Sequence, residues 1–115
     1  MMNLAHLNEI QISELALMLD EEFPEFVRTF ISHSENLILI LKQQLKARDT
    51  DGFITSIHSL KGSCRNVGAE QLADYCLQME TVARNASITS VDTDFISFDK
   101  EFEQLKSTLI KVARI

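Results

Sequence analysis

The sequence predicts an all-α fold, an antiparallel four-helix bundle with a short additional N-terminal helix. Three observations favour it. Long stretches repeat apolar residues every three or four positions, which gathers them on one face of a helix. No stretch alternates apolar and polar residues as a half-buried β-strand does. One proline and three glycines in 115 residues indicate short connections, and amphipathic helices joined by short connections pack best as an antiparallel bundle.

The first predicted helix is short and precedes the bundle. Ser13 is its expected N-cap, with Ile12 before it as a staple residue. Leu15, Met18 and Leu19 then fall at helical spacing. We expect this helix to cover one end of the bundle.

The second predicted helix has the clearest pattern. Pro24 suits its first turn, where the N–H that proline lacks would have no helical partner. The apolar residues that share one face are Phe23, Phe26, Val27, Phe30, Leu37, Ile38, Leu41 and Leu45. The tract RDTDG at 48–52 ends this helix and offers aspartate caps for the next.

The remaining three helices follow in order. The third runs from about Phe53 to Val67, and Gly68 ends it. The fourth starts near Ala69 and carries one apolar stripe: Leu72, Ala73, Cys76, Met79 and Ala83. The polar stretch 85–94 is predicted to be a connection. The fifth has a nearly heptad pattern: Phe95, Phe98, Phe102, Leu105, Leu109 and Val112. We expect Glu101 on its solvated face.

Length and charge restrict the class of protein. The chain suits one domain, residues 1–115. A net charge of −6 argues against non-specific nucleic-acid binding and against docking on an anionic membrane. No apolar run approaches the roughly 20 residues of a membrane span, and the start, MMNLAHLNE, has no signal-peptide pattern. We therefore expect a cytoplasmic protein, and a monomer, because no second apolar stripe demands a partner.

The segment SIHSLKGSCRNVGA at 56–69 places a histidine on a helix one turn before a glycine. On a helical wheel, one narrow arc forms the core face: Phe53, Ile57, Leu60, Cys64 and Val67. His58 lies roughly 120° from the centre of that arc, so it should be on the outer surface. Gly62 costs roughly 1 kcal/mol relative to alanine. It either allows close helix packing or leaves the imidazole open to something as large as another protein.

Positive charge follows His58 along the helix. Lys61 and Arg65 lie one and two turns later. Because nearby cations disfavour the imidazolium, we expect a mostly neutral, nucleophilic ring at pH 7. The same cations would stabilise an anion attached to that ring. This arrangement suits acceptance of a phosphoryl group from a protein partner. It does not suit hydrolysis, because the sequence shows no obvious base, orienting carboxylate or oxyanion site.

A longer pattern now points to a family. The run HSLKGS at 58–63, followed by Gly68, Ala69, Leu72, Cys76 and Glu80, resembles the signature of histidine-containing phosphotransfer (HPt) domains. The match has no gap over residues 58–80, and residues 22–45 resemble the helix that precedes the histidine helix in this family. In length and layout the chain is most similar to free-standing bacterial HPt proteins, including the quorum-sensing phosphorelay type.

The resemblance implies a phosphoryl carrier rather than an enzyme. HPt domains accept a phosphoryl group from the aspartate of one receiver domain and pass it to another. The expected partners are receiver domains of response regulators and of a hybrid sensor kinase. The receiver supplies Mg²⁺, so this chain is expected to hold no cofactor.

The resemblance also assigns roles to individual residues. His58 would be the phosphoacceptor, on Nε2, with Lys61 neutralising the phosphoryl group and Gly62 giving access to the ring. Gly68 would allow the tight turn between the third and fourth helices. Arg84 falls where some family members place a basic residue near the site.

Two other classes of function fit the sequence less well than histidine phosphotransfer does. In a histidine-kinase dimerisation domain an acidic residue typically follows the histidine, whereas here Ser59 follows His58, and the chain has no Gly-rich ATP-binding module. The alternative is a non-catalytic helical adaptor or degenerate HPt-like protein that binds a signalling partner. The pairing of Lys61 with Gly62 argues against it, because an adaptor needs neither an open histidine nor an adjacent cation.

A metal site is not expected. The three histidines, His6, His33 and His58, share no local ligand spacing. Both cysteines, Cys64 and Cys76, fall on predicted core stripes. We therefore interpret them as buried structural thiols.

Overall fold

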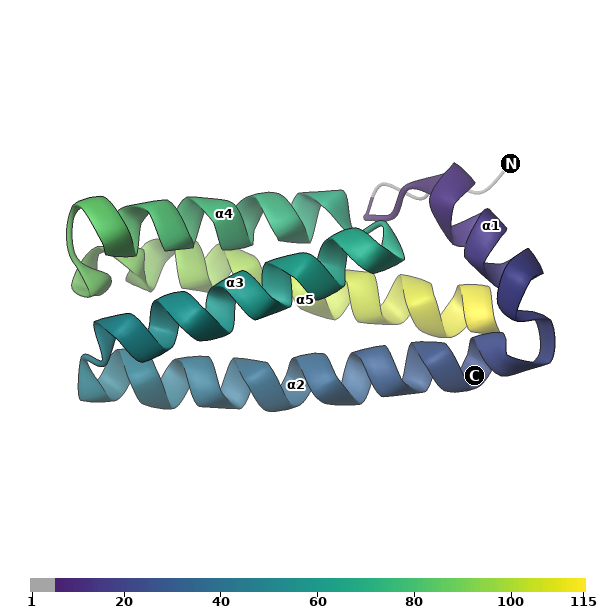
Figure 1. Ribbon diagram of the computed structural model, residues 1–115, viewed down its shortest axis with the longest axis horizontal. Coiled ribbons are helices and arrows are strands. Elements are labelled where there is room, and N and C mark those ends of the chain that lie inside the picture. Colours follow the sequence, from purple (N-terminus) through teal and green to yellow (C-terminus); the bar gives the residue numbers. More distant parts are fainter. Residues whose placement is uncertain (1–5) are drawn as a thin grey trace.

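The computed structural model describes residues 6–115, and four long helices in it lie side by side as an antiparallel bundle (Figure 1). The elements are α1 (Glu9–Leu19), the 3₁₀ helix η1 (Asp20–Glu22), α2 (Phe23–Ala47), α3 (Thr50–Val67), α4 (Glu70–Asn85), the 3₁₀ helix η2 (Ile88–Val91) and α5 (Asp92–Ala113). No strand occurs among the described residues, and the predicted all-α bundle is confirmed. Most of the N-terminal stretch considered for a signal peptide lies outside them. Within 6–115, no helix has the length and apolar character that crossing a membrane requires.

The core forms where the apolar faces of the four long helices meet. The predicted stripes of α3 and α4 are buried along their lengths, and α5 is buried from Phe95 to Leu109 on one face. The largest fully buried side chains include Leu41, Phe53, Ile57, Leu60, Leu72, Met79, Phe98, Leu105 and Leu109. Cys64 and Cys76 are both buried free thiols, as expected. A hydrogen bond with Cys64, together with burial, raises the pKa of the Cys76 thiol, which keeps it protonated.

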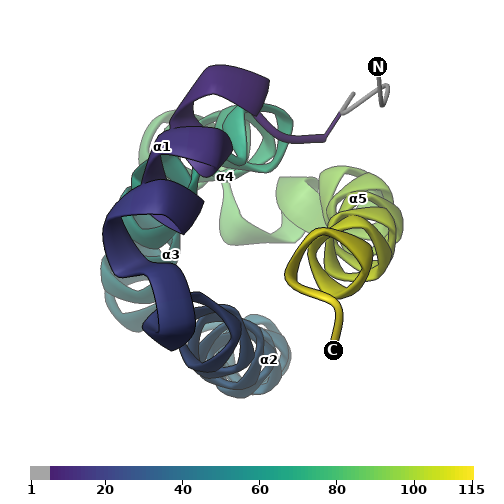
Figure 2. The ribbon, with the colours of Figure 1, turned by 90° about the vertical axis from the view of Figure 1, so that its right-hand side faces the viewer.

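α1 covers the end of the bundle at which α3 ends and α4 begins (Figure 2). The N–H of Asn8 donates to the carbonyl of Gly68 at 2.7 Å, and the side chain of Gln11 donates to the carbonyl of Arg65 at 2.6 Å. Asn8 is also the N-cap, because its Oδ1 accepts the N–H of Gln11. The predicted cap at Ser13 was wrong: a contact with a distant turn fixes the start of the helix, and Ser13 lies inside it.

Two other boundaries differ from the prediction. α3 begins at Thr50 rather than near Phe53, because Asp49 caps it by accepting the N–H of Gly52 at 3.0 Å. The stretch 85–94, predicted to be a connection, contains η2 and the start of α5. Its two apolar residues, Ile88 and Val91, are buried and tie the segment to the core.

Glu101 was expected on a solvated face, and this was wrong. The side chain is buried on α5, and its Oε2 lies 2.6 Å from Nδ1 of His6. A buried carboxylate needs such a partner. The pair therefore fastens the segment before α1 to the last helix.

Candidate functional site

The imidazole of His58 projects from the outer face of α3, as the helical wheel predicts. Its side chain is 66% exposed, whereas the five residues of the predicted core face are buried. The backbone that carries it lies in the middle of a helix whose opposite face packs into the core. His58 is therefore open to a large partner while its backbone is held firmly.

Gly62 leaves open space one turn beyond His58. A Cβ at this position would meet no atom within 4 Å beyond the adjacent backbone. Close helix packing therefore does not explain this glycine. The structure supports the other interpretation, in which the missing side chain keeps the ring accessible.

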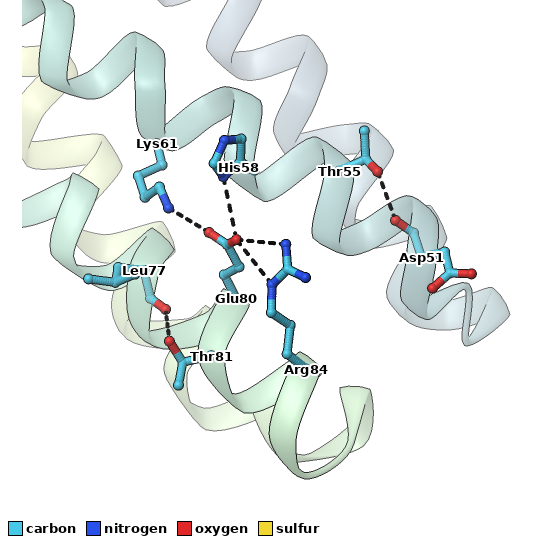
Figure 3. A network of polar contacts seen from close by, with 8 residues as sticks. All are labelled: Asp51, Thr55, His58, Lys61, Leu77, Glu80, Thr81 and Arg84. Carbon is cyan, nitrogen blue, oxygen red and sulfur yellow. Dashed lines mark hydrogen bonds and ion pairs between the residues drawn. The ribbon is translucent and has the colours of Figure 1, made fainter.

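A buried carboxylate on α4 joins the polar side chains around His58 (Figure 3). Oε1 of Glu80 accepts a hydrogen bond from Nζ of Lys61 at 2.7 Å. Oε2 of Glu80 accepts from Nε and Nη2 of Arg84 at 3.3 and 3.1 Å. The same Oε2 lies 3.4 Å from Nδ1 of His58. Glu80 thus faces the inner edge of the imidazole and two cations at once.

The two cations decide the charge state of Glu80. Burial by itself raises the pKa of this carboxyl group, because the charged form loses water. Hydrogen bonds from Lys61 and Arg84, together with the charge of Lys61, outweigh that effect, and the pKa of Glu80 lies below its ordinary value. Glu80 is therefore ionised at neutral pH.

Lys61 lies one turn after His58, and the structure adds a partner that was not expected. Its side chain is only 10% exposed and its ammonium is bound to Glu80. A wheel for one helix cannot show this, because the partner comes from α4. The positive charge of Lys61 is largely compensated by that carboxylate before it can act on His58.

Arg84 and Arg65 have different environments. Arg84 joins the network through Glu80, which agrees with its predicted place near the site. Arg65 is exposed two turns after His58 on α3, and within residues 6–115 its side chain makes no hydrogen bond or ion pair. The structure therefore brings Arg84, and not Arg65, to the carboxylate that faces the histidine.

Gly68 makes the tight turn that joins α3 to α4, as expected. Its φ is +83°, a left-handed conformation that glycine adopts without strain. Its N–H donates to Arg65 and the next N–H, from Ala69, donates to Cys64, which closes the end of α3 in a Schellman motif. The turn sets α4 beside α3, so that Glu80 faces His58.

Glu80 belongs to the sequence pattern of the family, but its role could not be predicted from the sequence. An orienting carboxylate was not expected near His58, and the structure shows that Glu80 lies beside it. A signal was present, because Glu80 falls on the apolar stripe of α4, four residues after Cys76 and three before Ala83. A charged residue on a core stripe indicates a buried ion pair. In the described part of the chain, no group of three His, Cys, Asp or Glu side chains is arranged to hold a metal ion.

Comparison with known protein families identifies the family of this chain. The model of the Hpt domain family matches residues 25–108, which include His58 and its whole network. The chain belongs to the Hpt domain family. Its members are phosphoryl carriers that interact with receiver domains of response regulators and kinases. The chain is therefore a histidine-phosphotransfer protein of a phosphorelay.

Individual relatives agree with this assignment. The chain is 26% identical over 106 residues to histidine-containing phosphotransfer protein 2 of Arabidopsis thaliana, covering 86% of this chain and 68% of that protein. It is 27% identical over 108 residues to histidine-containing phosphotransfer protein 1 of Oryza sativa subsp. japonica, covering 83% and 74%. The crystal structure of histidine-containing phosphotransfer protein B from Pseudomonas aeruginosa PAO1 superposes with a TM-score of 0.92, at 26% identity and over 97% of each chain.

Proposed function

We propose that His58 is the phosphoacceptor of this Hpt protein and that Nε2 is the nucleophilic atom. The observation that carries the proposal is the contact of Nδ1 with Glu80, on the inner edge of an otherwise exposed ring. An ionised carboxylate beside Nδ1 favours the tautomer with its proton there. The lone pair is then on Nε2, at the edge of the ring that faces away from Glu80.

The transfer step follows from this arrangement. The lone pair of Nε2 forms a bond to the phosphorus of a receiver's aspartyl phosphate. The bond from phosphorus to the aspartate oxygen breaks, and the carboxylate leaves with its electron pair. The ring keeps its Nδ1 proton and gains positive charge, which the Glu80 carboxylate stabilises. Transfer to the aspartate of a second response regulator is the reverse of this step.

The partner supplies the rest of the chemistry in this proposal. The receiver domain holds Mg²⁺ and the remaining catalytic groups, and this chain needs no cofactor of its own. We include the receiver of a hybrid sensor kinase as the donor. A monomer, a cytoplasmic location and a single domain over residues 1–115 also belong to the proposal.

Phosphoryl transfer from a labelled receiver tests the assignment of His58. Purified chain is incubated with receiver domains carrying radiolabelled phosphate, in the presence of Mg²⁺. We expect acid-labile, alkali-stable label on the wild type and on His33→Gln, which alters another exposed histidine of a long helix. We expect none on His58→Gln. Absence of label from every receiver in a broad panel would instead favour an adaptor that binds partners without transfer.

A further inference from the structure

α1 lies across one end of the bundle and buries little of its own surface (Figure 2). Of its eleven residues, Glu9–Leu19, one is buried, namely Ile12. In contrast, α3 and α4 each bury six residues over 18 and 16 positions. The most exposed large apolar side chains of the described chain, Leu17, Met18 and Ile10, are also on α1. An element with so few buried contacts opens at a lower free energy than the core does.

Asp20 forms the corner between α1 and the rest of the chain, and its backbone is strained. Its N–H donates to the carbonyl of Ala16 and ends α1, while its carbonyl accepts the N–H of Phe23 at the start of α2. Its φ and ψ are +48° and −112°, which is the conformation that glycine fills in a type II′ turn. An aspartate held there would lose strain by rotating to an ordinary conformation. Such a rotation moves α1 relative to α2.

Polar contacts fasten the opposite end of α1. The N–H of Asn8 and the side chain of Gln11 donate to carbonyls at the end of α3, at 2.7 and 2.6 Å. Nδ1 of His6 lies 2.6 Å from the buried carboxylate of Glu101 on α5. These contacts lie before α1 or in its first turn, whereas the strained residue follows its last turn. The helix is therefore latched at its start and strained at its end.

We propose that α1 is a hinged cap, which opens about Asp20 as one unit while α2, α3, α4 and α5 stay packed. In the open state the contacts of Asn8, Gln11 and His6 are broken, Ile12 leaves the end of the core, and Asp20 relaxes. The closed state is the one in the structure, because those contacts and the burial of Ile12 together outweigh the strain. The four long helices stay together because their apolar faces bury one another.

Amide hydrogen exchange of the intact chain, followed by NMR, tests whether α1 opens as a unit. We expect the hydrogen-bonded amides from Ile12 to Leu19 to share one degree of protection. They should exchange more than about tenfold faster than the amides of α3 in the core. Protection that instead rises steadily from one end of α1 to the other would show fraying and would overturn the inference.

Two substitutions of Asp20 test the hinge. Asp20→Gly removes both the carboxylate and the strain, whereas Asp20→Ala, the matched control, removes the carboxylate and keeps the Cβ that causes the strain. Because only glycine relaxes the closed state, we expect α1 to exchange about fivefold slower in Asp20→Gly than in Asp20→Ala. Equal exchange of α1 in the two variants would refute a strained hinge at this position.

His6→Ala tests the latch. It removes the partner of Glu101, so we expect α1 to exchange about fivefold faster than in the wild type. His33→Ala is the control, because His33 is exposed on α2, and it should leave the exchange of α1 unchanged. Exchange of α1 that does not respond to His6→Ala would show that this pair does not hold the cap closed.

The two native cysteines give an independent reference for opening. Ile12→Cys introduces a thiol beneath α1, while Cys64 and Cys76 are buried in the bundle. We expect a maleimide to modify the introduced thiol more than about tenfold faster than the native ones. Adding Asp20→Gly should slow that reaction about fivefold relative to adding Asp20→Ala, which ties it to the hinge. A single rate for all three thiols would show that α1 opens only when the whole bundle unfolds, and the cap would be refuted.

Discussion

Glu80 connects the nucleophile to the rest of the molecule. Its side chain contacts His58, Lys61 and Arg84 at the same time. Its carboxylate fixes the ring through Nδ1 and holds a lysine that would otherwise be an unpaired buried charge. A histidine that is 66% exposed is thus oriented by a group that is almost wholly buried.

The charge on Glu80 predicts how stability depends on pH. The pKa of Glu80 is lower in the folded state than in the unfolded chain, where it has the ordinary value for glutamate, about 4.3. Near that pH the unfolded chain therefore binds more protons than the folded chain does. The stability that Glu80 contributes is therefore present above that pH and is lost as the pH falls through the folded-state pKa. We expect the difference in unfolding free energy between wild type and Glu80→Gln to be largest near pH 7 and to shrink toward pH 3.

Urea denaturation at pH 7, 5, 4 and 3 measures this difference. Glu14→Gln is the control, because Glu14 is exposed on α1. A difference for Glu80→Gln that stays constant across the range would contradict the assignment of an ionised, cation-bound carboxylate.

Because open space surrounds Gly62, a larger side chain at this position should raise stability and slow phosphoryl transfer. Gly62→Gln replaces a poor helix former with a good one, and no neighbour obstructs the first atom of the new side chain. We expect the unfolding free energy to rise by about 0.5 kcal/mol, while phosphoryl transfer slows about tenfold, or ~1.4 kcal/mol in activation free energy, because the side chain crowds the ring.

Stopped-flow transfer rates and denaturation curves measure the two effects on the same samples. Ser107→Gln on α5 is the control for adding the same side chain to an exposed helix position. A normal transfer rate in Gly62→Gln would show that access over this glycine does not limit the reaction.

At the scale of elements, the end of α3 organises the molecule. Gly68 reverses the chain, its carbonyl accepts the N–H of Asn8, and Gln11 binds the carbonyl of Arg65. One turn therefore sets the pairing of α3 with α4 and the position of α1. The first of these brings Glu80 to His58. The second closes the end of the core over Ile12 and Val67, both of which are buried.

The same substitution, glycine to alanine, should have opposite effects on stability at Gly68 and at Gly62. Gly68→Ala forces alanine into a left-handed conformation at φ +83° and brings its Cβ to 3.3 Å from Cβ of Asn8. We expect a loss of about 1–2 kcal/mol in unfolding free energy. Gly62→Ala adds the same methyl group inside a helix with free space around it, and we expect a gain of about 0.5–1 kcal/mol. Chemical denaturation of the two variants tests both, and changes of the same sign would refute this account.

Local patterns predicted the helices better than their ends. Every long helix was predicted, because the spacing of apolar residues along a helix depends only on which of its faces is buried. The start of α1 was misplaced because Asn8 is fixed by Gly68, sixty positions away in the chain. η2 was missed because two buried residues, Ile88 and Val91, are too few to show a period.

Only the features of the site that depend on α3 alone could be predicted from the sequence. His58 and Gly62 were correctly placed on α3 because exposure and open space follow from the helical wheel. The burial of Lys61 and the role of Glu80 depend on how α4 packs against α3. Glu101 was misassigned for a similar reason, since its partner, His6, comes from the other end of the chain.

At the scale of the whole molecule, the bundle is elongated. Its extents are 42 × 23 × 18 Å, and its Cα radius of gyration is 14.5 Å. The most exposed large apolar side chains come from different helices: Ile10, Leu17 and Met18 on α1, Leu39 on α2, and Ile96 on α5.

The sequence predicts a monomer in solution. Sedimentation equilibrium should give a mass near 13.1 kDa, and small-angle X-ray scattering should give a radius of gyration close to 14.5 Å, slightly increased by side chains and hydration. Neither value should change with protein concentration. A mass that doubles on concentration would show self-association and contradict the proposed monomer.

His58 stands on helices that pack closely against each other, and this bears on what sets the direction of phosphoryl flow. The side chains around it stand on α3 and α4, which pack more extensively than any other pair of elements in the bundle. A modification can shift a conformational equilibrium only by as much as it favours one state over another. If phosphorylation leaves the packing of α3 on α4 unchanged, the free energy of the phosphoryl bond stays in that bond. Flow through such a carrier obeys mass action: the ratio of phosphorylated to free receivers on either side sets its direction, and the copy number of the carrier sets its capacity.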